Sequence, residues 1–130
     1  MIKNNKVLFY WLPVFIWLEI IFLLSSIPGS LLPKLPSLCN FWAHRIVHFS
    51  EYSILGVLLI RAYSYLRSRI GIITIIFLSM VIFLASSFDE WHQSFVPGRN
   101  CELIDVVFDT ICGTIALTIY VIWLKMRRFK

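Results

Sequence analysis

Four long apolar runs divide the sequence, and short polar segments separate them. The runs cover residues 8–27, 44–66, 70–88 and 103–124. Each is close to the ~20 residues that an α-helix needs to cross ~30 Å of hydrocarbon. A transmembrane sheet would have to close into a barrel, and the short alternating segments of barrel strands are not found. The pattern predicts an all-α integral membrane bundle of four transmembrane helices.

The composition favours the same class. Of the 130 residues, 59% are hydrophobic and 15% are charged, whereas a soluble domain carries about 25% charged residues. No linker and no internal repeat interrupt the pattern, so residues 1–130 are expected to form a single transmembrane domain. The basic start of the first run imitates a signal peptide, but the run is long and Glu19 interrupts it, so we expect an uncleaved helix.

The cations are unevenly divided between the two sides of the predicted membrane. The side that holds both chain ends carries Lys3, Lys6, Arg67, Arg69, Lys125, Arg127, Arg128 and Lys130, and the other carries Lys34, Arg45 and Arg99. By the positive-inside rule, both termini should be cytoplasmic. The expected location is the bacterial cytoplasmic (inner) membrane, crossed several times. The net charge of +5 follows from this topology and requires no nucleic-acid partner.

Polar residues recur at helical spacing within the predicted spans, so that each set shares one helix face. The sets are Glu19 and Ser26 on the first span, His44, His48 and Glu51 on the second, Ser86, Asp89 or Glu90, and Gln93 on the third if that helix continues past residue 88, and Asp105 and Asp109 on the fourth. A charge at membrane depth costs at least ~2.5–3.5 kcal/mol. Several such groups at one depth predict a shared polar cavity open to the outside.

The segment between the last two runs contains a turn signal. Pro97 and Gly98 suit the two central positions of a type II turn, because glycine tolerates the positive φ that the second position requires. This turn is expected to direct Arg99 back toward the acids, where a guanidinium group can hold carboxylates in a fork.

Two segments, "HRIVHFSEYSILG" and "DEWHQSFVPGRNCELIDVVFDT", resemble the VanZ-like family of bacterial membrane proteins. That family shows a D-K-x-x-H motif at the start of one helix, an E-x-x-Q-x-F-x-P-G-R loop and then D-x-x-x-N/D. The matching residues are Arg45, His48, Tyr52, Glu90, Gln93, Phe95, Pro97, Gly98, Arg99, Asp105 and Asp109. The segment "LSSIPGS", residues 24–30, is similar to the end of the family's first helix, so the resemblance spans nearly the whole chain.

Two positions depart from the family pattern. His44 replaces the acid that precedes the basic residue, which weakens the transfer of an ion pair to that point. Cys112 stands where a glycine often follows the second acid, which can alter packing on the fourth helix.

The resemblance implies a multi-span protein of the cell envelope. The family's founding member is associated with low-level resistance to the glycopeptide antibiotic teicoplanin. We therefore expect the polar cavity to bind an envelope lipid, a cell-wall precursor or a glycopeptide-like ligand. The expected binding residues are Glu90, Gln93, Arg99, Asp105, Asp109, His48, Glu51, Arg45 and Tyr52. Membrane lipids are the expected partners, and a homodimer is left open.

Two other functions stay open. The first is a membrane-embedded hydrolase or transferase acting on a lipid-linked or cell-wall substrate. Glu90 or Asp109 would serve as general base, His48 as its proton partner and Arg99 as the group that steadies an anion, although no nucleophile motif is found. The second is a small proton-linked transporter or flippase, which with four spans would need to dimerise.

Metal binding and a purely structural role are two alternatives to these functions. His44 and His48 have the spacing of two ligands on one helix face, and Glu51 adds a carboxylate. The chain lacks H-E-x-x-H, and the family motif retains only His48. We therefore expect no bound metal and no cofactor. Buried ion pairs can also merely fix helix register, but acids outnumber cations in this region, and crowded carboxylates need a proton, a metal or a cationic ligand.

The three cysteines give little information about fold or function. Cys39 and Cys101 fall in segments expected to face outward, so a disulfide between them is left open. Cys112 lies in the fourth span and is expected to pack as a small side chain.

Overall fold

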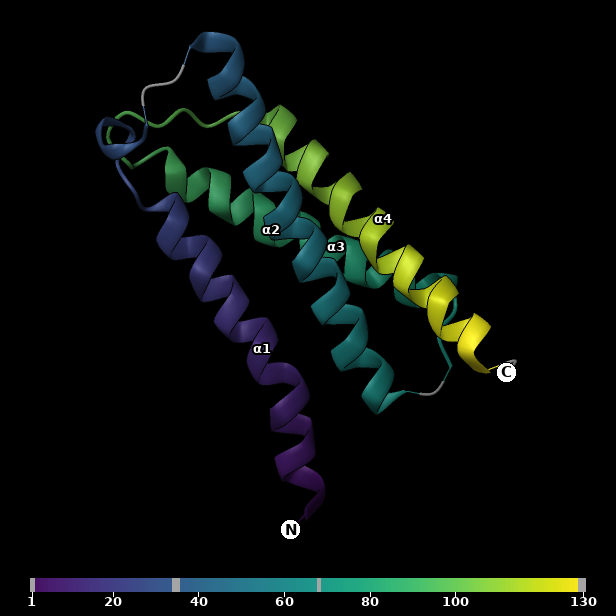
Figure 1. Ribbon diagram of the computed structural model, residues 1–130. Helices are drawn as coiled ribbons and strands as arrows, with labels where there is room; N and C mark the ends of the chain where they lie inside the picture. Colours follow the sequence, from purple (N-terminus) through teal and green to yellow (C-terminus); the bar gives the residue numbers. More distant parts are fainter. Residues whose placement is uncertain (1, 34–35, 68, 129–130) are drawn as a thin grey trace.

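The computed structural model describes residues 2–33, 36–67 and 69–128. The helices are α1 (Ile2–Ser25), a short 3₁₀ helix η1 (Gly29–Leu31), α2 (Ser37–Leu66), α3 (Ile72–Gln93) and α4 (Leu103–Arg128), and these residues contain no strand (Figure 1). The long helices contain apolar spans that could each cross a membrane: Lys6–Ser25, Phe41–Leu66, Ile72–Gln93 and Leu103–Arg127. The prediction of a four-helix membrane bundle is confirmed.

Two helix boundaries differ from the predicted spans. α2 begins at Ser37, directly after Pro36, so the aromatic residues before the apolar run belong to the helix. A proline is compatible with the residue just before a helix, where no N–H is needed. α3 continues past Phe88 to Gln93, because its polar last turn packs against the other helices and is buried. The third polar face therefore forms as the sequence analysis required.

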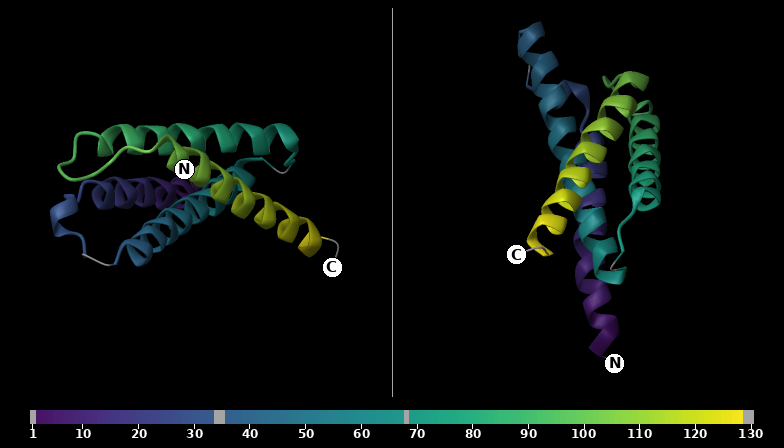
Figure 2. Two further views of the ribbon diagram at one scale, coloured as in Figure 1. Left: turned by 90° about the horizontal axis from the view of Figure 1, so that it is seen from above. Right: turned by 90° about the vertical axis from the view of Figure 1, so that its right-hand side faces the viewer.

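α2 is the central helix and packs against α1, α3 and α4 (Figures 1 and 2). The segments after α1 and after α3 lie together at one end of the bundle, and both chain ends point toward the other end (Figure 1). We call the first end the loop end and define it by residues 26–33 and 94–102. The common direction of the termini agrees with an even number of spans. Their cytoplasmic orientation stays a prediction.

The half of the bundle away from the loop end has an apolar core, in which Leu59, Leu78, Leu117 and Val121 are almost fully buried. The outer surface is equally apolar, as shown by exposed side chains such as Ile73, which is 80% exposed. A soluble monomer rarely exposes a continuous apolar surface of this extent. Contact with lipid therefore explains why the outer faces of the helices are as apolar as the buried ones.

α2 and α4 approach each other at a pair of glycines. A side chain at Gly56 of α2 would collide with the backbone carbonyl oxygen of Gly113 in α4. Small residues allow membrane helices to pack with their backbones nearly in contact. α1 is attached differently, because the Trp17 indole donates a hydrogen bond to the backbone carbonyl of Glu51 at 2.8 Å.

Candidate functional site

The ends of the four long helices at the loop end bury an unusual number of polar side chains. The buried polar residues here are Ser25, His48, Glu51, Ser86, Asp89, Glu90, Gln93, Asp105 and Asp109. They come from the last turn of α1, the first half of α2, the end of α3 and the start of α4. The structure thus brings the predicted polar faces of the second, third and fourth spans together.

Asp109 of α4 is the centre of one buried network. Its carboxylate oxygens lie 3.1 and 3.2 Å from Nδ1 of His48, and it accepts a hydrogen bond from the Ser86 hydroxyl at 2.7 Å. The serine proton points at the aspartate and not at the histidine. These three side chains are therefore not arranged as a Ser-His-Asp nucleophile, in which the histidine contacts the serine.

Arg45 of α2 is the centre of a second network. It forms an ion pair with Asp105 and lies 3.6 Å from Glu102. Its guanidinium group also lies over the rings of Phe41 and Phe108, at 5.3 and 5.5 Å from their centroids. Although this chain lacks the family's acid at position 44, the cation finds its partner across the bundle on α4.

The end of α3 holds polar groups with unused hydrogen-bonding capacity. Gln93 donates to Asp89 at 3.0 Å, and Glu90 accepts from the backbone N–H of Glu102 at 2.8 Å. Within the described part of the chain, one oxygen each of Asp89, Glu90 and Gln93, together with the Tyr52 hydroxyl, is buried without a partner. Leaving a buried polar atom unpaired costs ~1–3 kcal/mol, so this end of the bundle is prepared to accept further donors.

The loop after α3 contains the predicted turn. The Arg99 N–H donates to the carbonyl of Val96 at 3.1 Å, and Gly98 has φ of 75°, as a type II turn requires. The segment after α1 packs directly on this turn: the Gly29 N–H donates to the Pro97 carbonyl at 3.0 Å, and a side chain at Gly29 would collide with the Gly98 carbonyl. The two Pro-Gly segments therefore form one unit.

Arg99 has different partners from those expected. Its Nε and Nη2 donate to the backbone carbonyls of Ile27 and Leu24, both at 3.1 Å, and no described carboxylate lies within ion-pair distance of it. The prediction that Arg99 holds carboxylates was wrong. The last carbonyls of a helix lack intrahelical donors and carry partial negative charge, so the end of α1 competes successfully for the guanidinium group.

Two adjoining cavities open among these side chains. The first has a volume of about 300 Å³ and combines an apolar wall, including Leu24, Ile27 and Val47, with a polar wall that includes Glu51. The second, of about 240 Å³, is lined largely by polar side chains. Both share the side chains of Leu32, His44, Gln93 and Arg99.

The model of the VanZ/LLP1 family matches residues 7–124, which include every apolar span almost entirely and both motif segments. The chain belongs to the VanZ/LLP1 family. Comparison with curated proteins gave no match, and comparison with solved structures gave none. Family membership and the four apolar helices together make this a multi-pass, VanZ-like envelope protein.

Nine of the eleven VanZ/LLP1 motif residues fall into two groups; the other two, Phe95 and Pro97, are exposed and lie outside the cavities. One group lines the cavities and consists of Arg45, His48, Gln93, Gly98, Arg99 and Asp105; Glu51, outside the motif, joins them. The other group is buried behind the walls and consists of Tyr52, Glu90 and Asp109.

Several residues of this VanZ/LLP1 protein lie where the sequence analysis did not place them. Glu19 is exposed, so its predicted place among the acids was wrong. The packed face of α1 contains Val14 and Ile21, and at 3.6 residues per turn Glu19 points away from it. His92, for which no role was predicted, lies 2.9 Å from the Ser26 hydroxyl and against the Phe22 ring, and so joins α3 to α1.

The cysteines carry no cross-link. Cys39 and Cys101 are exposed and free, and Cys112 is buried, as its predicted packing role requires. The close approach of α4 to α2 is made at the neighbouring residue, Gly113.

Proposed function

We propose that this VanZ/LLP1 protein binds an amphiphilic envelope molecule, either a lipid or a lipid-linked cell-wall precursor, in the cavities at its loop end, and that this end faces outward. The observation that carries the proposal is the two-sided lining of the first cavity. Its apolar wall suits a hydrocarbon segment, and its polar wall suits a headgroup. The volume of about 300 Å³ is at the lower end of the range for ligand sites, ~300–1,000 Å³.

The charges at the cavity favour a headgroup rich in hydrogen-bond donors. The Glu51 carboxylate lines the first cavity and has no hydrogen-bond or ion-pair partner among the described residues, whereas the Arg45 guanidinium group is paired with Asp105 and that of Arg99 contacts backbone carbonyls. Carboxylates accept hydrogen bonds, so hydroxyl or ammonium groups are the suitable partners. Sugars, amines and glycopeptides all carry such groups.

Native mass spectrometry of the purified protein tests this proposal. We expect a specific envelope lipid to remain bound to the wild type and to be lost from Val47→Phe, which fills the first cavity. Val107→Phe is the matched control, because Val107 is similarly exposed (51% against 47% for Val47) but does not line the cavity. The proposal is contradicted if the folded wild type carries only bulk membrane lipid.

Teicoplanin susceptibility tests the phenotype associated with the family's founding member. Wild-type protein expressed in a susceptible host should raise the inhibitory concentration, and Val47→Phe should abolish the increase at equal membrane abundance. If abundant wild type changes nothing, family membership predicts the fold and the site but not resistance.

The His48–Asp109 pair supports a second candidate, an enzyme acting on a lipid-linked substrate. His48 lines the first cavity while Nδ1 contacts Asp109, which leaves Nε2 free to exchange a proton with a substrate. Unchanged lipid and peptidoglycan composition in a deletion strain would contradict this candidate.

A further inference from the structure

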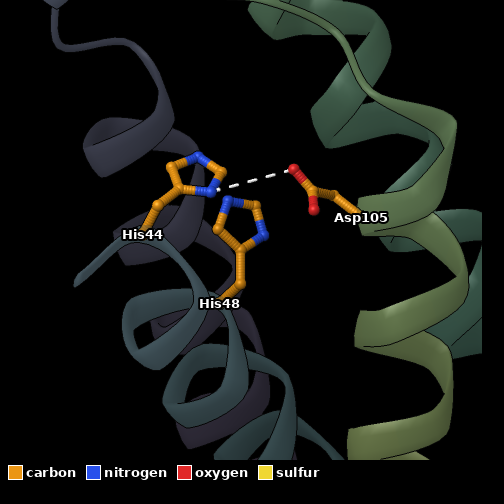
Figure 3. Close-up of side chains that lie close together, drawn as sticks. All are labelled: His44, His48 and Asp105. Atoms are coloured by element: carbon orange, nitrogen blue, oxygen red, sulfur yellow. Dashed lines mark ion pairs between the residues drawn. The ribbon is translucent and has the colours of Figure 1, made fainter. Parts of the chain in front are cut away.

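Two histidines and an aspartate meet where the two cavities adjoin (Figure 3). His44 and His48 are one turn apart on α2, and Asp105 comes from the first turn of α4. One potential ligand atom from each residue lies within 4.8 Å of the other two. The separation of His44 Nδ1 and Asp105 Oδ2 is 3.8 Å. The geometry points to a binding site for a divalent transition-metal ion of the Zn²⁺ type, held by His44, His48 and Asp105.

The ligand atoms, 3.8 Å apart for His44 and Asp105 and all within 4.8 Å of one another, lie farther apart than they would around a bound ion. Zn²⁺ binds histidine nitrogen and carboxylate oxygen at ~2.0–2.2 Å, usually in a tetrahedral arrangement, so neighbouring ligand atoms lie roughly 3.3 Å apart. Small side-chain rotations would close the remaining gaps. Two imidazoles and one carboxylate are ligands that favour transition metals over Mg²⁺ or Ca²⁺.

Outer partners already orient two of the three ligands. His48 is held through Nδ1 by Asp109, which is held in turn by Ser86, and its other ring nitrogen points toward His44 in Figure 3. One carboxylate oxygen of Asp105 is paired with Arg45, and the other faces His44. A metal-binding histidine typically donates its second ring N–H to a carboxylate, which fixes the tautomer and the ring orientation.

Two independent observations also indicate a cation here. First, the acids Glu51, Asp89, Glu90, Asp105 and Asp109 are all buried at the loop end, and their described cationic partners are few, since Arg99 contacts backbone carbonyls. A divalent ion would balance part of this charge. Second, Gln93 is 2% exposed, lines both cavities and has an unpartnered Oε1. A metal-bound water is a suitable donor for that oxygen.

Three protein ligands leave a coordination position free on the cavity side. An open position of this kind is found in Zn²⁺ sites that bind water or substrate, whereas structural sites are closed by four protein ligands. The site goes beyond the proposed function, because the cavity can bind its ligand by shape and hydrogen bonds whether or not an ion is present.

Metal titration of the full-length protein in detergent tests the site. After treatment with a chelator, Zn²⁺ is added in competition with a chromophoric chelator, and Co²⁺ serves as a spectroscopic substitute. We expect a single Zn²⁺ per chain, a Co²⁺ absorption band of the intensity typical of tetrahedral coordination, and no displacement by excess Mg²⁺. A folded, monodisperse wild type that retains no Zn²⁺ would overturn the inference and leave an ion-pair network only.

Variants locate the ion. Asp109→Asn, which removes an outer partner, should weaken Zn²⁺ binding by ~10–100-fold. His44→Gln removes a ligand whose side chain is 36% exposed, so the fold should tolerate it, and binding should weaken by more than for Asp109→Asn. His92→Gln is the matched control, because His92 lies outside the cluster. Equal affinity in His44→Gln and His92→Gln would overturn the assignment, even if Asp109→Asn fails to fold.

Discussion

The buried charges at the loop end stabilise the fold only as pairs. Arg45 and Asp105 illustrate this, because the Arg45 side chain is 14% exposed and that of Asp105 only 2%. The attraction between two buried charges is largely offset by the cost of removing both from water. Removal of one partner leaves the other charge buried and uncompensated, whereas removal of both avoids that cost.

A double-mutant cycle at Arg45 and Asp105 measures this dependence. Arg45→Met should lower the free energy of unfolding by ~3–5 kcal/mol, because the Asp105 carboxylate stays buried without a cation. The double variant Arg45→Met/Asp105→Leu should be much closer to the wild type. Unfolding in detergent, followed by circular dichroism, gives the free energies. Additive effects of the two substitutions would show that the residues are not energetically coupled.

Contacts between helices depend on glycines that the hydrophobic pattern does not distinguish. Gly56 and Gly113 bring the backbones of α2 and α4 together, which sets the spacing between His48 on one helix and Asp109 on the other. Gly29 and Gly98 do the same for the two loops. Each contact joins residues far apart in sequence, so only the folded chain shows that the glycines meet.

Alanine substitutions separate this role from a general effect of glycine. Gly56→Ala should destabilise the protein by ~1–3 kcal/mol, the usual cost of overpacking, because the added methyl group meets the Gly113 carbonyl. Gly71→Ala is the matched control: nothing lies within 4 Å of the added atom and its φ is −112°, so its expected cost is only that of a poorer N-cap residue of α3, about 0.5–1 kcal/mol. Thermal unfolding of both variants in detergent provides the comparison. Equal midpoints would contradict the role of the glycine contact.

The chain as a complete bundle was largely predictable, and its individual contacts were less so. Four apolar runs predicted four helices. The helical spacing of His48 and Glu51 predicted their burial, because an ionisable group at membrane depth must face the bundle interior to avoid contact with lipid. Glu19 was misplaced because α1 is apolar on all sides and its sequence does not show which face packs. The partners of Arg99 were missed because they are backbone carbonyls, which any sequence would supply.

The natural cysteines can report the orientation of the bundle. Cys39 and Cys101 are exposed near the loop end and Cys112 is buried, so a membrane-impermeant maleimide applied to intact cells should label the first two and not the third. Desolvation and the nearby Glu90 carboxylate raise the pKa of the Cys101 thiol. Its reactive thiolate is therefore scarcer at neutral pH, and labelling of Cys101 should accelerate as the pH rises. Labelling only after the cells are permeabilised would place the loop end in the cytoplasm.

The hydrogen bond from Arg99 to Ile27 also has a consequence for biosynthesis, because it joins residues 72 positions apart. A chain is made from its N-terminus at ~5–20 residues per second, so α1 enters the membrane several seconds before its partner arginine exists. During that interval the carbonyls of Leu24 and Ile27 have no guanidinium group to contact. The walls of the two cavities, which both include Arg99, can therefore be completed only after α3 and the following turn have been made. In a chain that ends before Arg99, α1 would be held by its contacts with the other helices alone.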